Sequence, residues 1–181
     1  MSYHKLNKPM KKLSFLLLTT SIILCFGCSK KDDVNANPKA ATLLAKTWNL
    51  AGLKLKTNVK TYDIPKNISL NDFSVVVFDG KGGASSSDGT TTTEGTYVLA
   101  SDNVKLTLTE SNGDVTNFYI NSISDTSLEL ALIAVDQSKK TLTNEEEISS
   151  FLTAIMAIAA NIDFGTTKPT SAQPIFAFTT K

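Results

Sequence analysis

The chain has 181 residues and nearly balanced charge, with 18 basic and 17 acidic side chains and a formal net charge of +1. Every one of the 18 is a lysine, and without arginine the chain lacks the bidentate clamp that proteins use for phosphate and carboxylate groups. It also lacks the excess of basic residues that binding to nucleic acid requires. One His and two Cys are too few for a structural zinc set. We therefore expect no metal, no cofactor and no nucleic-acid partner.

Residues 1–27 have the layout of an export signal. Four lysines within the first twelve residues precede an apolar run from Leu13 to Phe26. This order of basic, then apolar, then small residues is typical of a secretory signal peptide. The run is about fourteen residues long, whereas a membrane span needs about 20. We therefore predict a removable signal peptide that starts at Met1 or at Met10.

The end of this segment, Gly27-Cys28, resembles a lipobox, in which a lipoprotein signal peptidase cuts before a diacylglyceryl-modified Cys. The alternative is that Cys25 and Cys28 are both ordinary apolar residues of the signal. The resemblance implies cleavage between Gly27 and Cys28, with the lipid anchor on Cys28. A lipoprotein Cys carries two or three acyl chains, and since one chain alone binds a membrane only marginally, the additional chains make the anchor durable.

Residues 29–33 (SKKDD) resemble the charged tag that follows the lipidated Cys in Bacteroidota-type lipoproteins. The resemblance implies that the protein is located at the outer membrane and favours display on its outer face. The alternative is that residues 29–33 are only a solvated linker. Cleavage would remove four lysines, leaving 14 against 17 acidic residues. It would also remove His4 and Cys25, which leaves no Ser-His or Cys-His nucleophile pair and no disulfide within the chain. We therefore do not expect an enzyme.

Residues 28–42 are expected to form the lipidated Cys and a flexible tether, and residues 43–181 a single β domain. The segment Trp48–Thr57 alternates leucine and lysine, which predicts a half-buried strand. Further strands are expected at 61–64, 73–78, 95–100, 104–110, 115–123 and 127–135, separated by turn residues. Asn112-Gly113 is a strong hairpin signal. The pattern predicts a mainly β fold, an antiparallel up-and-down meander that closes as a barrel or half-barrel.

Two segments depart from the alternating pattern. Residues 84–94 (ASSSDGTTTTE) are polar and of low complexity, which indicates a flexible hairpin loop or, as a functional alternative, a rim loop at a barrel mouth. Thr143 to Glu147 is typical of a helix start. The helix is predicted over about 144–162, amphipathic and packed on the sheet, with Gly165 ending it and a short final strand near 174–178. Its apolar stripe, expected to be buried, comprises Ile148, Phe151, Leu152, Ile155, Ile158, Ala159 and Ile162.

Taken in order, the segments 44–50, 78–80, 95–97, 105–109, 119–120 and 127–130 resemble the lipocalin-like domains of small Bacteroidota-type lipoproteins. The resemblance implies a lipocalin-like barrel in which Trp48 closes one end and is structural. It also implies a cavity for an apolar ligand. The tyrosines that could line such a cavity are Tyr62, Tyr97 and Tyr119.

Three functions follow as hypotheses. The first is a cell-envelope lipoprotein that binds a small hydrophobic ligand or glycan, which predicts a cavity of about 300 Å3 or more. The second is a non-catalytic structural or interaction subunit, or an inhibitor, at the outer membrane, which predicts a filled core and an exposed apolar patch. The third, carboxylate catalysis, is disfavoured because turns are where solvated Asp is usual. Its candidate residues are Asp63, Asp72, Asp79 and Glu94.

Overall fold

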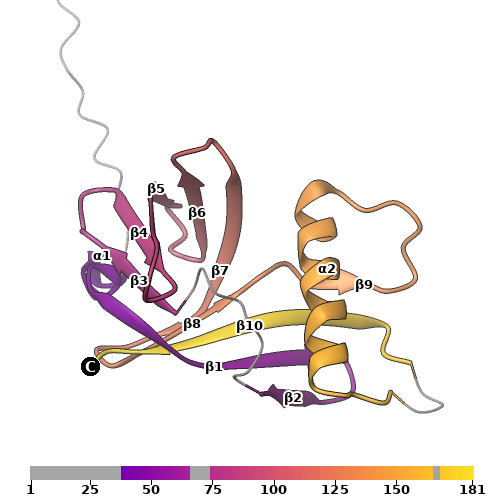
Figure 1. Ribbon diagram of the computed structural model, residues 1–181. Helices are drawn as coiled ribbons and strands as arrows, with labels where there is room; N and C mark the ends of the chain where they lie inside the picture. The colour runs from indigo at the N-terminus through magenta and orange to yellow at the C-terminus, as the bar shows by residue number, and fades with distance from the viewer. Residues whose placement is uncertain (1–37, 66–73, 165–167) are drawn as a thin grey trace, which may run out of the picture. The chain divides into compact units, whose positions relative to one another are not determined.

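The computed structural model describes residues 38–65, 74–164 and 168–181. These residues form a mainly β domain, with ten strands in one antiparallel sheet and two helices (Figure 1). In chain order the elements are α1 (Pro38–Leu44), β1 (Thr47–Thr57), β2 (Thr61–Ile64), β3 (Val75–Phe78), β4 (Gly83–Ser87), β5 (Thr92–Leu99), β6 (Lys105–Glu110), β7 (Val115–Ile123), β8 (Ser127–Ala131), β9 (Val135–Asp136), α2 (Asn144–Ala159) and β10 (Ser171–Thr179).

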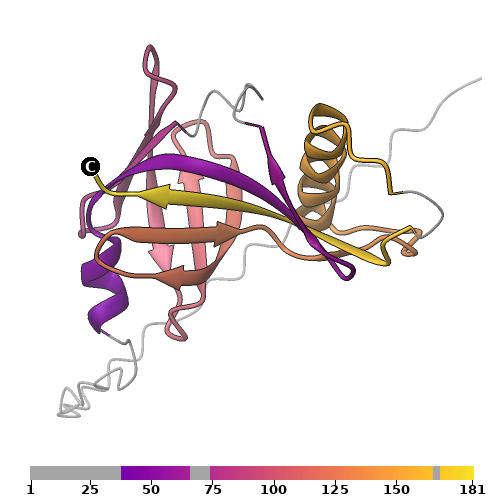
Figure 2. The same ribbon diagram turned by 90° about the horizontal axis from the view of Figure 1, so that it is seen from below.

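The sheet is a meander that nearly closes in a ring. Its strand order is β2-β1-β3-β4-β5-β6-β7-β8-β10-β9, and an additional antiparallel pairing of β1 with β10 brings the two sides of the sheet together. Figure 2 shows β1 and β10 running side by side. The predicted antiparallel meander is therefore confirmed, and the sheet is ring-like.

Alternating burial along the strands places one set of side chains inside the ring. In β5, Tyr97 and Leu99 are partly buried while Val98 between them is 66% exposed. Leu99 lies opposite Leu106, which in turn lies opposite Phe118 on β7. Because successive side chains of a strand point to opposite faces, these rows of apolar residues meet inside the ring.

Helix α1 packs against the core and contacts β7. Leu44 of α1 and Trp48 of β1 are both fully buried, and the indole Nε1 of Trp48 donates a hydrogen bond to the Leu44 carbonyl at 2.9 Å. Beside them Phe118 packs edge-on against Phe176, with ring centroids 5.8 Å apart. We expected residues 38–42 to belong to a flexible tether; instead Pro38–Leu44 is helical, because Leu44 joins the core.

The paired strands β1 and β10 continue past the ring as a long ribbon. β2 pairs with the second half of β1, and β9 with the first residues of β10. α2 packs against this part of the sheet, contacting β10, β1 and β9. In both Figure 1 and Figure 2, α1 and α2 lie at opposite ends of the domain.

Four segments differ from the sequence expectation. β4 and β5 occupy most of the predicted loop 84–94, so the turn between them is short. The helix ends at Ala159 rather than near 162, and the final strand is not short, since β10 has 9 residues and pairs with β1 and β8. Segment 127–135 is divided between β8 and β9. Phe73 and Gly165 lie outside the described residues.

Candidate functional site

The two residues expected at the lipid anchor, Gly27 and Cys28, lie outside the described residues. In the part of the chain that the structure describes, no helix has the length and apolarity needed to cross a bilayer.

The three tyrosines expected to line a ligand cavity are not brought together. Tyr97 lies inside the ring, edge-on to Phe78 at a centroid distance of 5.0 Å. Tyr62 lies on β2, where its ring contacts Phe164 at 6.0 Å and carries the Lys60 ammonium 4.4 Å from its centroid. The side chains of Tyr97 and Tyr62 therefore pack in different parts of the domain.

The third tyrosine, Tyr119 on β7, lies outside the ring and faces α2. Its hydroxyl donates to Glu145 Oε1 at 2.9 Å, and partial burial together with this carboxylate raises the pKa of Tyr119. Lys105 Nζ approaches the other oxygen of Glu145 at 4.0 Å. Tyr119 therefore joins β7 to the start of α2.

The space inside the ring is small. The pocket at its mouth has a volume of about 30 Å3, whereas a cavity needs about 10–15 Å3 to hold one water and a drug-sized ligand site is about 300 Å3 or more. Among the described residues, large apolar side chains fill the rest of the interior. The lining of this pocket comes from β3 to β7 and includes Val76, Ala84, Ser86, Thr93, Gly95, Leu108, Glu110 and Thr116.

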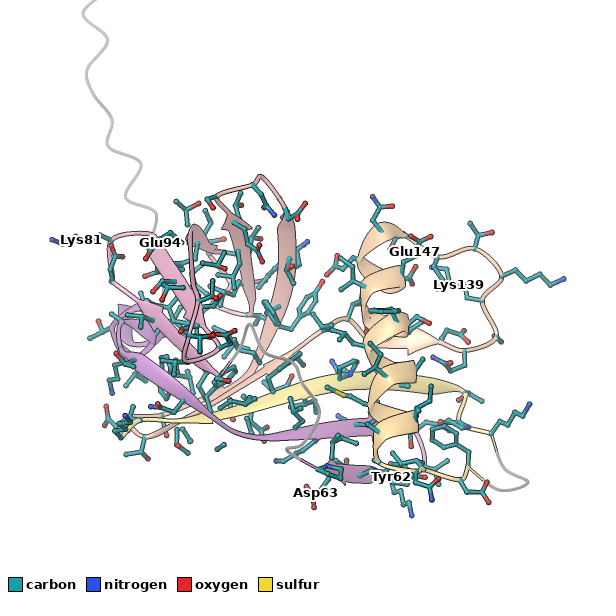
Figure 3. All side chains as sticks on the ribbon, viewed as in Figure 1. Tyr62, Asp63, Lys81, Glu94, Lys139 and Glu147 are labelled. Atoms are coloured by element: carbon teal, nitrogen blue, oxygen red, sulfur yellow. The ribbon has the colours of Figure 1, made fainter. Side chains whose placement is uncertain are left out.

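The carboxylates considered for catalysis do not converge. Asp79 Oδ1 accepts hydrogen bonds from the backbone N–H groups of Lys81 (2.7 Å) and Gly83 (2.8 Å), which lower the pKa of Asp79. Asp79 thus fixes a turn. Asp63 is on β2 and Glu94 on β5, and Figure 3 shows them far from each other. Asp72 lies outside the described residues, and the described residues contain no cluster of metal-binding side chains.

The first turn of α2 is held by a capping box. The Glu146 backbone N–H donates to the Thr143 hydroxyl oxygen at 3.3 Å, and the Thr143 backbone N–H donates to Glu146 Oε2 at 2.9 Å. Lys139 Nζ lies 2.7 Å from both Glu146 carboxylate oxygens, which are largely buried. The hydrogen bond from Lys139, followed by that from Thr143, lowers the pKa of Glu146. The helix start predicted from sequence is confirmed.

The side of α2 that packs on the sheet is mostly polar. Its buried residues are Glu146, Ser149, Thr153 and Met156. Ser149 is fully buried, and its hydroxyl donates to the Ile133 carbonyl at 2.6 Å. The Thr153 hydroxyl is buried with no hydrogen-bond partner among the described residues. A helix normally buries its apolar stripe; α2 buries three polar side chains together with Met156.

The opposite side of α2, here called the α2 outer face, consists of Ile148, Phe151, Ile155 and Ile158. Phe151 is 66% exposed and Ile158 80%, and Ile148 is 39% exposed. The expectation that the whole stripe is buried is therefore wrong for these three residues, and also for Ala159, which is exposed. Leu152 and Ile162 from the same stripe do pack against the core. Sequence periodicity identified the apolar stripe without showing which side of the helix meets the sheet.

A groove runs beside the α2 outer face, between the start of β7 and the start of α2. Its volume is about 430 Å3, and Val115 on its rim is 51% exposed. Ile148 belongs both to the groove and to the α2 outer face. The groove is lined by Val115, Thr116, Asn117, Leu132, Thr143, Asn144, Glu145 and Ile148.

The groove adjoins the α2 outer face at Ile148, and its lining combines apolar side chains (Val115, Leu132 and Ile148) with polar ones, among them Glu145. Such a surface can contact another molecule, and within the described residues it brings together no nucleophile with a base. No protein-family model, curated protein or solved structure matches this chain.

Proposed function

We propose that this protein is a non-catalytic interaction subunit of the cell envelope, which binds a partner protein through the α2 outer face. The observation that carries the proposal is the exposure of Phe151 and Ile158 on a helix whose opposite side is polar and buried. Exposed apolar patches on folded domains commonly mark sites of interaction. Fully burying an apolar side chain of this size contributes about 1.5–3 kcal/mol. In the isolated domain these side chains stay in contact with water, so a partner that covers them is stabilised by their burial.

The carriage of a small hydrophobic ligand or glycan by a lipocalin-like domain has weaker support. The order of the antiparallel strands and the buried Trp48 at one end of the ring favour a lipocalin-like ancestry. The pocket at the mouth of the ring, however, is about 30 Å3, roughly a tenth of what such a ligand requires. We therefore place the functional surface on α2 and outside the ring.

The proposed address is the outer membrane, with the chain anchored through acyl chains on Cys28. The support lies in the sequence: the export signal, Gly27-Cys28 and the charged residues behind it. The substitution Cys28→Ala tests it. The parent chain should incorporate a fatty-acid probe and sediment with membranes, whereas the variant should do neither; incorporation of the probe by the variant would refute Cys28 as the anchor.

Crosslinking in intact cells tests the interaction itself. A photoreactive amino acid is placed at position 151, on the α2 outer face, or at position 98, an equally exposed position on the outside of the ring. We expect position 151 to give one reproducible protein adduct that position 98 does not give. If both positions give the same adducts, or neither gives any, the proposal fails. Native mass spectrometry of the same preparation would reveal a bound small molecule, which would favour the carrier function instead.

A further inference from the structure

We infer that the occupant of the α2 outer face is an amphipathic helix of the partner protein, with Lys or Arg residues beside its apolar stripe. This inference rests on the proposed interaction function and names the chemistry of the partner. It follows from the shape of the surface and from its charge.

The shape suits a helix. The four residues of the α2 outer face follow one another at i, i+3, i+7 and i+10 along a helix of 16 residues, which is about 24 Å long. Helix-in-groove recognition uses anchors at this spacing. The groove beside Ile148 has a volume of about 430 Å3, and an exposed valine, Val115, forms its far rim. A partner helix lying along α2 would cover this apolar row and place side chains in the groove.

The charge near the α2 outer face favours a cationic partner. Residues 144–163 include three glutamates and one aspartate but no lysine. Lys105 and Lys139 approach this region, but they pair with Glu145 and Glu146. Glu147 is exposed and forms no ion pair within the part of the chain that the structure describes; Figure 3 shows it on α2. Because like charges oppose and opposite charges steer binding, a basic partner helix fits and an acidic one does not.

The composition of α2 argues against a lipid surface as the occupant. Helices that lie on anionic membranes carry Lys or Arg on their polar face, whereas residues 144–163 contain no lysine. This part of the chain therefore lacks the cations that would hold it on an anionic bilayer.

A second copy of the chain is also a poor fit. Two copies joined through this face would bring their acidic helix starts into the interface without any lysine from α2. A separate partner helix that carries Lys or Arg beside its apolar stripe avoids this repulsion.

Two synthetic helices test the inference. They share one leucine stripe, but one carries lysine and the other glutamate at all flanking positions, and each bears a fluorophore. The mature chain, processed in cells and held in nanodiscs of zwitterionic lipid, is titrated with each peptide, and empty nanodiscs serve as the blank. The double variant Phe151→Ser/Ile158→Ser removes the apolar anchors, Glu147→Lys reverses the charge, and Val98→Ser is the matched control at an exposed position.

We expect the lysine peptide to bind at least about tenfold more tightly than the glutamate peptide, a difference of about 1.4 kcal/mol. The double serine variant should lose that binding, Glu147→Lys should narrow or reverse the preference, and Val98→Ser should change nothing. Equal binding of the two peptides, binding that survives the double variant, binding to empty nanodiscs alone, or self-association of the chain would each overturn the inference. A crosslinked partner at position 151 combined with no charge preference would leave the proposed function standing and refute only the basic helix.

Discussion

Ser149 and Phe151 are two residues apart on α2 and lie on opposite sides of it. Ser149 is fully buried and donates to the Ile133 carbonyl, whereas Phe151 keeps 66% of its surface exposed. The helix is thus attached to the sheet by a polar side, Met156 and flanking apolar residues, and it presents its largest apolar residue outward. This arrangement makes the α2 outer face the main claim about function.

Serine at Phe151 or Ile158 should barely change the stability of the isolated domain. Exposed positions usually change the free energy of unfolding by no more than about 0.5 kcal/mol. Met156→Ala, at a fully buried position of the same helix, should cost about 2–5 kcal/mol. Urea unfolding of the three variants measures this. A loss above about 2 kcal/mol for Phe151→Ser would mean that the domain itself covers this face.

The substitution Thr143→Ala should destabilise the domain by about 1 kcal/mol, because it removes the hydroxyl that accepts the Glu146 N–H. Thr143→Ser keeps that oxygen and should retain most of the stability. Chemical denaturation of both variants gives the comparison. Equal losses for alanine and serine would show that the cap contributes nothing and that the methyl group matters instead.

Acid should weaken the attachment of α2 through Glu146. The hydrogen bonds from Lys139 and Thr143 lower the pKa of this carboxyl in the folded state, so its contribution is complete above the unfolded pKa of about 4.3 and is lost as the pH falls through the lower folded value. The free energy of unfolding, measured from pH 7 to pH 3, should therefore fall less steeply for Glu146→Gln than for the parent. If the free energy of unfolding fell equally with pH in the parent and in Glu146→Gln, this role of Glu146 would be contradicted.

Helix α1 should behave as part of the domain. Leu44→Ala should cost about 2–5 kcal/mol, because this fully buried side chain packs beside Trp48. Ala41→Ser, at an exposed position of the same helix, should be close to neutral. Trp48 is the only tryptophan in the chain, so its fluorescence follows unfolding directly. If Leu44→Ala were neutral as well, α1 would be part of a tether after all.

Much of the sheet could be predicted from the sequence because its strands alternate apolar and polar residues. β6 alternates leucine with lysine or threonine, and Asn112-Gly113 supplies the turn, with Gly113 at a φ of 93° that glycine tolerates. The start of α2 could also be predicted, because Thr143 and Glu146 have the spacing of a capping box. In each case a short stretch of chain contains the whole signal.

Other features depend on contacts that a short stretch cannot show. β4 (GASSS) has no apolar alternation; its Ala84 pairs with Gly95 of β5, where a Cβ would lie 2.5 Å from the Thr109 carbonyl oxygen, so small residues there permit close packing. The orientation of α2 was missed for a related reason. The partners of Ser149 and Glu146 are Ile133, which lies before β9, and Lys139, which lies after it, and these contacts decide which side of the helix is buried.

The accessibility of position 151 in intact cells tests the central claim most directly. Phe151→Cys and Val98→Cys variants are treated with a membrane-permeant maleimide, in cells and after purification away from other proteins; under the proposed processing, the only other cysteine in the mature chain is the acylated Cys28. The account predicts that both positions react at similar rates in the purified protein, and that position 151 reacts much more slowly than position 98 in cells. Equal rates in cells would contradict the claim that a partner covers the α2 outer face.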